Sequence, residues 1–91
     1  MGRYRKRPIV IDAVPVADLL AAALRDWAEL PAWVADAYDH GDILFLPGGI
    51  NVTTAEGVMV GDRGDWLIRG IKGELYPCKP DIFEATYEAV P

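Results

Sequence analysis

The spacing of apolar residues changes at Gly41, and this change constrains the fold more than any other feature of the chain. Before Gly41, apolar residues recur at positions i, i+3, i+4, i+7, i+8 and i+11 in the stripe Val16, Leu19, Leu20, Ala23, Leu24 and Trp27. After Gly41, short apolar runs alternate with glycine-rich turns. Helices followed by short strands predict an α+β domain, a small and mostly antiparallel β-sheet covered by one or two helices.

Prolines and a glycine delimit the helical part of the chain. Pro15 ends a preceding extended segment, and the apolar stripe predicts an amphipathic helix from Val16. Pro31 either stops this helix or opens a second short helix over residues 32–38, because a proline at the first helical position loses no hydrogen bond. Gly41 then follows at the place where a glycine commonly ends a helix.

The remaining segments show the alternation and the turn residues of short strands. We expect strands over residues 4–14, 43–46, 50–54, 57–60, 66–71, 74–78 and 85–90, with a helical turn over 80–84. The segments 50–54 and 57–60 form one predicted hairpin, and 66–71 and 74–78 form another. Pairing of the first and last strands would anchor both ends of the chain.

Length and composition limit the class of protein. The chain has 91 residues, which suffice for a single domain over residues 1–91, and its 25% charged and 52% apolar residues are typical of a globular protein. No apolar run is long enough to span a membrane, and the early apolar stretch is too broken for a signal peptide. The single cysteine excludes an intramolecular disulfide and offers no metal-site spacing. We expect a cytoplasmic protein.

Charged residues are distributed unevenly around a net charge of −5. Basic residues gather in two segments, formed by Arg3, Arg5, Lys6 and Arg7 and by Arg63, Arg69, Lys72 and Lys79. Acidic residues instead occupy the helical segment, at Asp18, Asp26, Glu29, Asp36, Asp39 and Asp42. If the two basic segments meet, the fold has a positive end and a negative side. The alternative is that these charges are ordinary solvated faces.

Both ends of the chain carry motifs that resemble a known family. Residues 4–8 read Tyr-Arg-Lys-Arg-Pro, residues 64–66 read Gly-Asp-Trp, and residues 73–83 read Gly-Glu-Leu-Tyr-Pro-Cys-Lys-Pro-Asp-Ile-Phe. In this order the motifs resemble a family of small uncharacterised proteins of tailed phages and prophages. The resemblance covers about a third of the chain directly and implies a phage accessory protein in an infected or lysogenic bacterium. It implies no established activity and assigns no catalytic residue.

Catalytic chemistry has little support in the sequence. Cys78 would need a base or a positive environment to act as a nucleophile, and the only histidine, His40, lies far along the chain. Glu74, Asp81 and Glu84 supply carboxylates, but no spacing distinguishes an acid–base pair. One histidine and one cysteine do not make a metal site, and the glycines do not form a nucleotide-binding loop. We therefore predict a protein that is not an enzyme and has no cofactor.

A binding site for a small anion has better support than a catalytic site. Five residues of the C-terminal third combine positive charge with flat aromatic faces: Arg69, Lys72, Lys79, Trp66 and Tyr76. Basic groups bind phosphate and aromatic faces stack a base, so the first functional prediction is the binding or sequestration of a nucleotide-type ligand. The alternative is that the aromatic residues belong to the core. Extended nucleic acid is disfavoured because the acidic total opposes phosphate-driven binding.

The second functional prediction is protein interaction. A small sheet with exposed edge strands could dimerise, so a homo-oligomer is among the expected partners. The acidic helical segment from Asp18 to Asp42 could instead bind a host or phage protein, as a virion-associated module would. The alternative is a solvated helix face.

Overall fold

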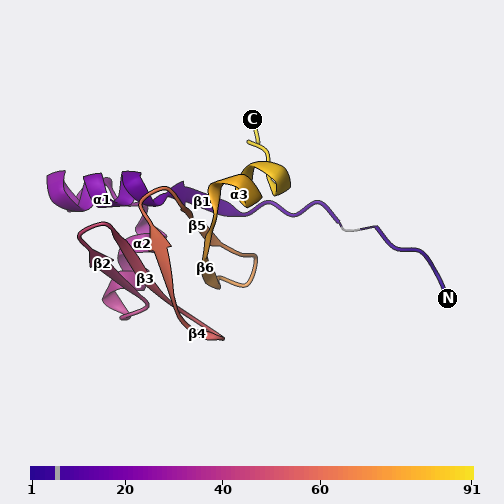
Figure 1. Ribbon diagram of the computed structural model, residues 1–91, viewed down its shortest axis with the longest axis horizontal. Helices are drawn as coiled ribbons and strands as arrows, with labels where there is room; N and C mark the ends of the chain where they lie inside the picture. The colour runs from indigo at the N-terminus through magenta and orange to yellow at the C-terminus, as the bar shows by residue number, and fades with distance from the viewer. Residues whose placement is uncertain (6) are drawn as a thin grey trace.

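The computed structural model describes residues 1–5 and 7–91, and it confirms a small α+β fold. Its strands form two antiparallel three-stranded sheets, β1-β5-β6 and β2-β3-β4, instead of one sheet (Figure 1). The elements in chain order are β1 (Asp12–Pro15), α1 (Val16–Arg25), the 3-10 helix η1 (Trp27–Glu29), α2 (Ala32–Asp39), β2 (Ile43–Leu46), β3 (Gly49–Thr54), β4 (Gly57–Asp62), β5 (Trp66–Arg69), β6 (Leu75–Cys78) and α3 (Pro80–Thr86). No helix of the described residues is long and apolar enough to cross a membrane.

The sheet β1-β5-β6 joins the beginning of the chain to its last third. Asp12 pairs with Arg69 and Pro15 with Trp66, while Trp66 also pairs with Cys78 on its other side. The predicted hairpin over 66–71 and 74–78 is confirmed as β5 and β6. Both sides of β5 are thus occupied, and β5 is the central strand.

The predictions for the terminal strands are wrong. The predicted strand over 4–14 is reduced to β1, because β5 offers only four positions for pairing. Its Lys6 lies outside the described residues. The predicted strand over 85–90 is absent: α3 continues to Thr86, and the described residues 87–91 contain no strand. Each segment has strand-forming residues, but a strand also needs a neighbour with free backbone groups.

The first helix follows the predicted stripe over most of its length. Val16, Leu19 and Leu20 are buried, and Ala22 is buried as well. Trp27, the last residue of the predicted stripe, lies beyond α1 in η1 and is 40% exposed, and within α1 Leu24 is the exception, with 91% of its surface exposed. It lies in the last turn of α1, which projects past the strands (Figure 1), so helical spacing alone extends the buried stripe too far.

The second helix begins at the predicted residue and ends one residue later than predicted. Pro31 is the residue before its first turn, and the helix ends at Asp39. Gly41 has φ +80°, a left-handed conformation that favours glycine. The N–H groups of Gly41 and Asp42 then donate to the carbonyls of Tyr38 and Ala37 at 3.0 and 2.9 Å, which satisfies the end of the helix and turns the chain into β2.

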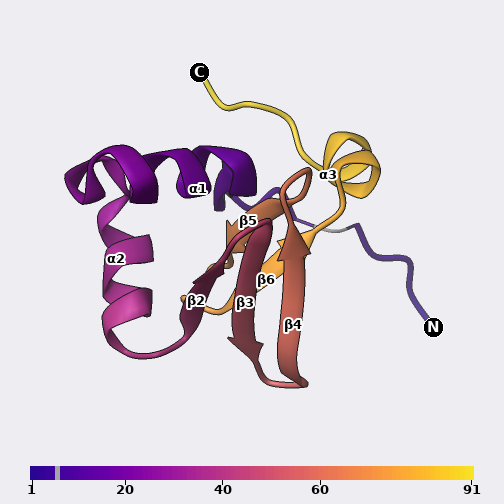
Figure 2. The same ribbon diagram turned by 60° about the vertical axis from the view of Figure 1, so that its left-hand side comes forward.

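Apolar residues between the two sheets and the first two helices form the main core. This core contains Val16, Leu19, Leu20, Ala22, Leu30, Val34, Ala37, Ile43, Ile50, Val52 and Leu67. The sheets approach closely where Gly61 of β4 meets Pro77 of β6, since a Cβ added to Gly61 would lie 3.3 Å from the Pro77 Cβ. Helix α3 lies apart from α1 and α2, beside the sheet β1-β5-β6 (Figure 2).

Candidate functional site

The residues of the predicted anion site lie on opposite faces of β5. Consecutive strand residues point to opposite faces, so Trp66 and Ile68 share one face while Leu67 and Arg69 share the other. Tyr76 pairs with Ile68 and therefore lies on the Trp66 face. The structure thus separates Arg69 from Trp66 and Tyr76.

Arg69 is already engaged by two groups of the same molecule. Its Nε and Nη2 donate to the Asp12 Oδ2 at 3.1 and 2.5 Å. Its guanidinium carbon also lies 5.3 Å from the ring centre of Trp33, within the range of a cation–π contact. Asp12 therefore neutralises much of the charge that the sequence prediction assigned to a phosphate.

Lys79 is likewise paired with carboxylates. Its Nζ lies 3.0 Å from the Asp65 Oδ2 and 3.3 Å from the Asp62 Oδ2. The hydrogen bonds to Asp65 and then Asp62 raise the pKa of Lys79. The side chain joins the start of α3 to the turn between β4 and β5.

Lys72 occupies an exposed position in the hairpin between β5 and β6. Its backbone N–H donates to the Glu74 Oε1 at 3.3 Å. Within the described part of the chain its ammonium forms no ion pair. Arg69 and Lys79 are therefore paired with carboxylates, whereas the Lys72 ammonium has no ion-pair partner among the described residues and stays available to a ligand.

The two predicted aromatic residues contact the C-terminal segment. Trp66 stacks on Phe83 of α3, with ring centres 4.0 Å apart and planes inclined by 9°. The Tyr76 hydroxyl lies 3.3 Å from that of Tyr87. Burial, followed by this hydrogen bond, raises the pKa of Tyr76 to about 12. Both residues are half-buried and lie outside the main core, so the alternative that they are core residues is not confirmed, but their rings pack on the C-terminal segment.

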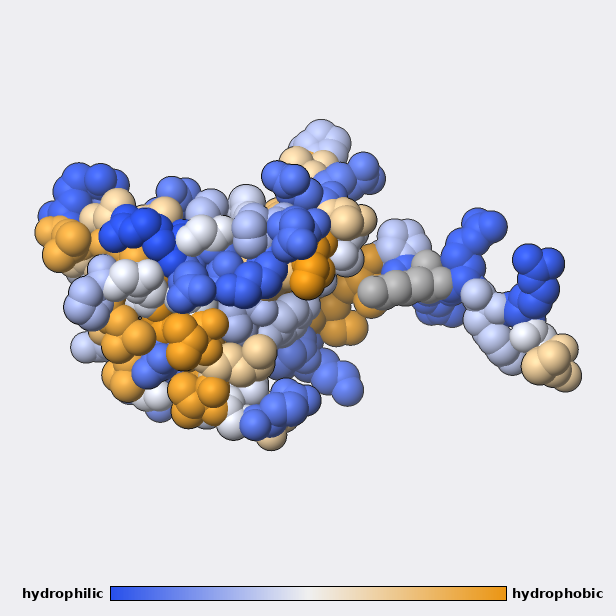
Figure 3. Space-filling view, viewed as in Figure 1, coloured by the Kyte–Doolittle hydropathy of each residue, from blue (hydrophilic) through white to orange (hydrophobic). Residues whose placement is uncertain are grey.

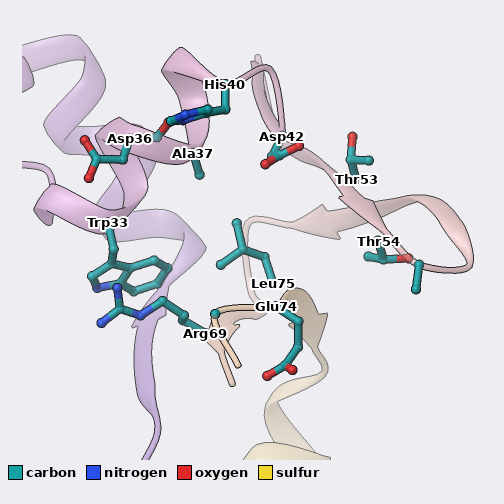
Figure 4. A pocket seen from close by; sticks show the side chains of 12 residues that line it. Trp33, Asp36, Ala37, His40, Asp42, Thr53, Thr54, Arg69, Glu74 and Leu75 are labelled. Atoms are coloured by element: carbon teal, nitrogen blue, oxygen red, sulfur yellow. The ribbon is translucent and has the colours of Figure 1, made fainter. Parts of the chain in front are cut away.

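A different set of residues surrounds a cleft of about 360 Å³, which we call the α2 cleft (Figure 4). Its lining comes from α2, the start of β2, the end of β3 and the β5–β6 hairpin: Trp33, Asp36, Ala37, His40, Asp42, Thr53, Thr54, Ala55, Arg69, Gly73, Glu74 and Leu75. Figure 4 shows the Arg69 side chain lying against the Trp33 indole, with Leu75 near the middle of the lining. The cleft therefore has an apolar floor and a polar rim.

The rim of the α2 cleft is acidic. Asp36, Asp42 and Glu74 stand around it, and among the described residues the one lysine or arginine in its lining is Arg69, already paired with Asp12. These carboxylates do not converge on a point, and the described residues contain no cluster of three or more groups able to hold a metal ion. Such a rim attracts an extended organic cation more readily than an anion or a bare metal ion.

His40 is held at the C-terminal end of α2, on the rim of the cleft. Its Nδ1 lies 2.7 Å from the Asp36 carbonyl oxygen, and Nδ1–H donates to that carbonyl because a carbonyl oxygen only accepts. Among the hydrogen bonds of the described residues, no carboxylate orients this ring in the way that a general base requires. The arrangement gives His40 a structural and rim-lining role.

The sequence contained part of the signal for this cleft. Asp36 and Asp42 belong to the acidic segment, and Glu74 is one of the three carboxylates near Cys78. Trp33 lies in the predicted helix over residues 32–38, where no spacing indicates a cleft. The meeting of α2 with the β5–β6 hairpin depends on contacts between distant segments, which apolar spacing does not reveal.

A second hollow, of about 580 Å³, lies between the two ends of the chain; we call it the terminal hollow. Arg7 of the first basic segment meets Gly70 and Tyr76 of the last third here. Glu74 and Glu88 line the same hollow and oppose the charge of Arg7. Arg7 is the one basic residue among the described residues that line the hollow, so the hollow does not bring the two basic segments together.

The environment of Cys78 disfavours a nucleophile. Burial and then the charges of Asp65 and Asp81 raise the pKa of this thiol. Its Sγ lies 3.6 Å from the Lys79 carbonyl oxygen, and no histidine contacts it among the hydrogen bonds of the described residues. A higher pKa lowers the thiolate fraction at neutral pH.

Comparisons with protein-family models, with curated proteins and with solved structures found no match for this chain. The fold and the two hollows therefore define a small α+β domain with candidate binding surfaces. The resemblance of the chain ends to small phage proteins stays a prediction.

Proposed function

We propose that this protein is a non-enzymatic protein-interaction module whose α2 cleft receives a basic side chain of a partner. One observation carries the proposal: three carboxylates from three parts of the chain, Asp36, Asp42 and Glu74, surround a cleft whose arginine is already neutralised by Asp12. A lysine or arginine side chain of a partner would enter a field of negative sign.

The contact between Arg69 and Trp33 supports this choice of ligand. It places a guanidinium 5.3 Å from the ring centre of the indole within the cleft itself. Arg69 occupies that face of the indole, so the contact shows the chemistry that the cleft accommodates and not a free aromatic face. Leu75, which is half-buried beside it, offers apolar surface for the aliphatic stem of an incoming side chain.

The proposal can be tested by titrating the labelled protein with short capped peptides and following its amide and indole signals by NMR. An acetylated and amidated Gly-Arg-Gly peptide should shift signals of Trp33, His40 and Thr53, with an effect that weakens as salt is added. Replacing Asp36 and Asp42 by asparagine together should weaken binding at least severalfold, because it removes charge while preserving shape.

Two controls make the result specific. Asp39→Asn removes a charge from the same helix outside the lining of the cleft and should leave binding nearly unchanged. A peptide with citrulline in place of arginine keeps the shape and lacks the charge. Equal shifts with citrulline and arginine, or equal effects of the Asp39 and Asp36/Asp42 changes, would overturn the proposal.

A small anionic ligand is the second candidate, and the terminal hollow is the observation that favours it. Arg7 and the backbone of Gly70 lie there beside the half-buried ring of Tyr76. Lys72, in the hairpin that follows Gly70, adds an exposed ammonium nearby in sequence. Glycine backbone and arginine are groups that bind phosphate.

Thermal unfolding with a panel of mono-, di- and cyclic nucleotides tests this second candidate. A ligand that binds the folded state raises the melting temperature, and an Arg7→Ala, Lys72→Ala variant should lose that rise. Arg3→Ala, an exposed change outside the lining of the hollow, is the matched control. A panel without effect at millimolar concentration excludes this candidate.

The biological setting follows from the resemblance of the chain ends and is part of the proposal. A phage or prophage accessory protein would act in the cytoplasm of an infected or lysogenic bacterium, and the basic partner would be a host or phage protein. An acidic cleft is suited to such a role because charge complementarity steers association and excludes acidic partners.

A further inference from the structure

Strand β4 has an open edge whose charged residue, Asp62, stands only at its end. It is the terminal strand of the sheet β2-β3-β4, and residues 57–61 read Gly-Val-Met-Val-Gly. Exposed edge strands usually carry lysine, proline or a bulge that prevents pairing with another chain. Figure 2 shows β4 at the side of its sheet remote from α2, so the first two helices do not cover this edge.

One hydrogen bond between β3 and the β2 side of the sheet shows which backbone N–H and C=O groups of β4 point toward the open edge. The Thr53 N–H donates to the Asp42 carbonyl, on the side of β2, at 2.9 Å. Backbone groups of successive strand residues point to alternate sides, so Thr53 does not bond to its partner Val58 in β4. Val58 and Val60 therefore direct their N–H and C=O groups toward the open edge.

The side chains at this edge are also uncovered. Val58 is 65% exposed and Val60 is 59% exposed, and Leu44 and Leu46 of β2 are exposed on the same face of the sheet. Figure 3 shows apolar side chains gathered over the region of β2 to β4. An apolar face beside an open edge is the arrangement of an interaction surface.

We propose that β4 pairs with β4 of a second copy of this chain, antiparallel and about a two-fold axis at Met59, independently of the α2 cleft. In this register Val58 lies opposite Val60 of the second copy, and the reverse pair forms by symmetry. Both residues then exchange backbone hydrogen bonds across the axis. The two sheets become one sheet of six strands, with the valines of both copies in contact.

Charge complementarity at the strand ends selects a second copy over an unrelated peptide. Glu56 precedes β4 and Arg63 follows it; both are exposed, and neither forms an ion pair with any residue in the ranges 1–5 and 7–91. Antiparallel pairing brings Glu56 of each copy beside Arg63 of the other. Asp62, which lies opposite Glu56 of the second copy, shares the Lys79 ammonium with Asp65, at 3.3 and 3.0 Å.

Sedimentation velocity of the full chain at increasing concentration tests the proposal. We expect a reversible monomer–dimer equilibrium, and Val60→Lys should shift it to monomer because it places two ammonium groups beside the axis. Val90→Lys, which introduces the same charge at a 66% exposed site outside the sheet, should leave the dimer intact. Circular dichroism of both variants verifies that they are folded.

A charge exchange then distinguishes this register from any other contact. Arg63→Glu should weaken the dimer, because it places a third carboxylate beside Glu56 and Asp62, and adding Glu56→Arg to it should restore the dimer. Hydrogen exchange should show the Val58 and Val60 amides protected in the dimer and exposed in Val60→Lys. A chain that stays monomeric at millimolar concentration, or a dimer indifferent to Val60→Lys and Arg63→Glu, would overturn the proposal.

Discussion

The Asp65 carboxylate accepts a hydrogen bond from the Lys79 ammonium at 3.0 Å, although Asp65 is only 4% exposed. The same oxygen accepts the Asp62 N–H at 2.9 Å. Asp65 thereby closes the turn between β4 and β5 and connects it to the start of α3. Lys79 therefore connects structural elements first, ahead of its predicted role in binding an anion.

Replacing Asp65 with alanine should lower the free energy of unfolding by about 1–3 kcal/mol, because the Asp62 N–H loses its acceptor in a partly buried site. Urea denaturation measures the change. Asp39→Ala, at an exposed position of α2, should change it by less than about 0.5 kcal/mol. Similar effects of the two changes would contradict a structural role for the Asp65 carboxylate.

The adjacent glycines 48 and 49 should respond differently to alanine. A Cβ on Gly49 would lie 2.3 Å from the Gly61 carbonyl oxygen, whereas one on Gly48 would meet nothing within 4 Å. Gly49→Ala should therefore lower the melting temperature and cost about 1 kcal/mol or more, because β3 and β4 must move apart. Gly48→Ala is the matched control, and calorimetry that ranks the two variants equally would argue against this close approach.

The Trp66–Phe83 stack should hold α3 on the sheet. Phe83→Leu should destabilise the protein by about 1–2 kcal/mol and increase proteolysis within α3, because it removes the ring that lies 4.0 Å from Trp66. Ile82→Ala changes the neighbouring residue, which is 55% exposed, and should be nearly silent. Equal protease sensitivity in both variants would mean that the stack does not anchor α3.

Stability should fall at alkaline pH through Tyr76. Its pKa is raised from 10 to about 12 in the folded protein, so the unfolded chain loses this proton first. The contribution of Tyr76 to the free energy of unfolding is complete below pH 10 and is lost as the pH rises toward 12.

Tyr87→Phe removes one cause of the shift and should lower the pKa of Tyr76, since burial remains but the hydrogen-bond partner is gone. Near-ultraviolet absorbance during titration follows the phenolate, and Tyr76→Phe identifies its signal by difference. An unchanged titration of Tyr76 in Tyr87→Phe would contradict the role of this hydrogen bond.

The local elements were largely predictable because their signals are local. Proline and glycine delimit α2, and short apolar runs with two-residue or glycine-rich turns predict the hairpins β3–β4 and β5–β6. The strand predictions for residues 4–14 and 85–90 failed because strand propensity alone does not form a strand where no neighbouring strand is available for pairing. The exposed Leu24 shows the same limit in a helix, since a stripe does not reveal where the sheet beneath it ends.

The candidate sites were less predictable than the elements. Arg69 and Trp66 belong to one short strand, yet alternation along that strand sends them to different faces. The cations of the predicted anion site can be identified in the sequence, but their counterions are visible only in the structure. Asp12 pairs with Arg69, and Asp65 pairs with Lys79. Whether a charge is free for a ligand depends on such long-range pairing.

The sequence by itself determined the α+β class, most helices and hairpins, and the uneven distribution of charge, because each depends on neighbours a few positions apart. Only the tertiary structure decided that the strands divide into two sheets, that Asp36, Asp42 and Glu74 surround one cleft, and that β4 keeps an open edge. These features arise from contacts between segments distant in the chain. Burial and charge pairing across such distances set them, and no local pattern contains that information.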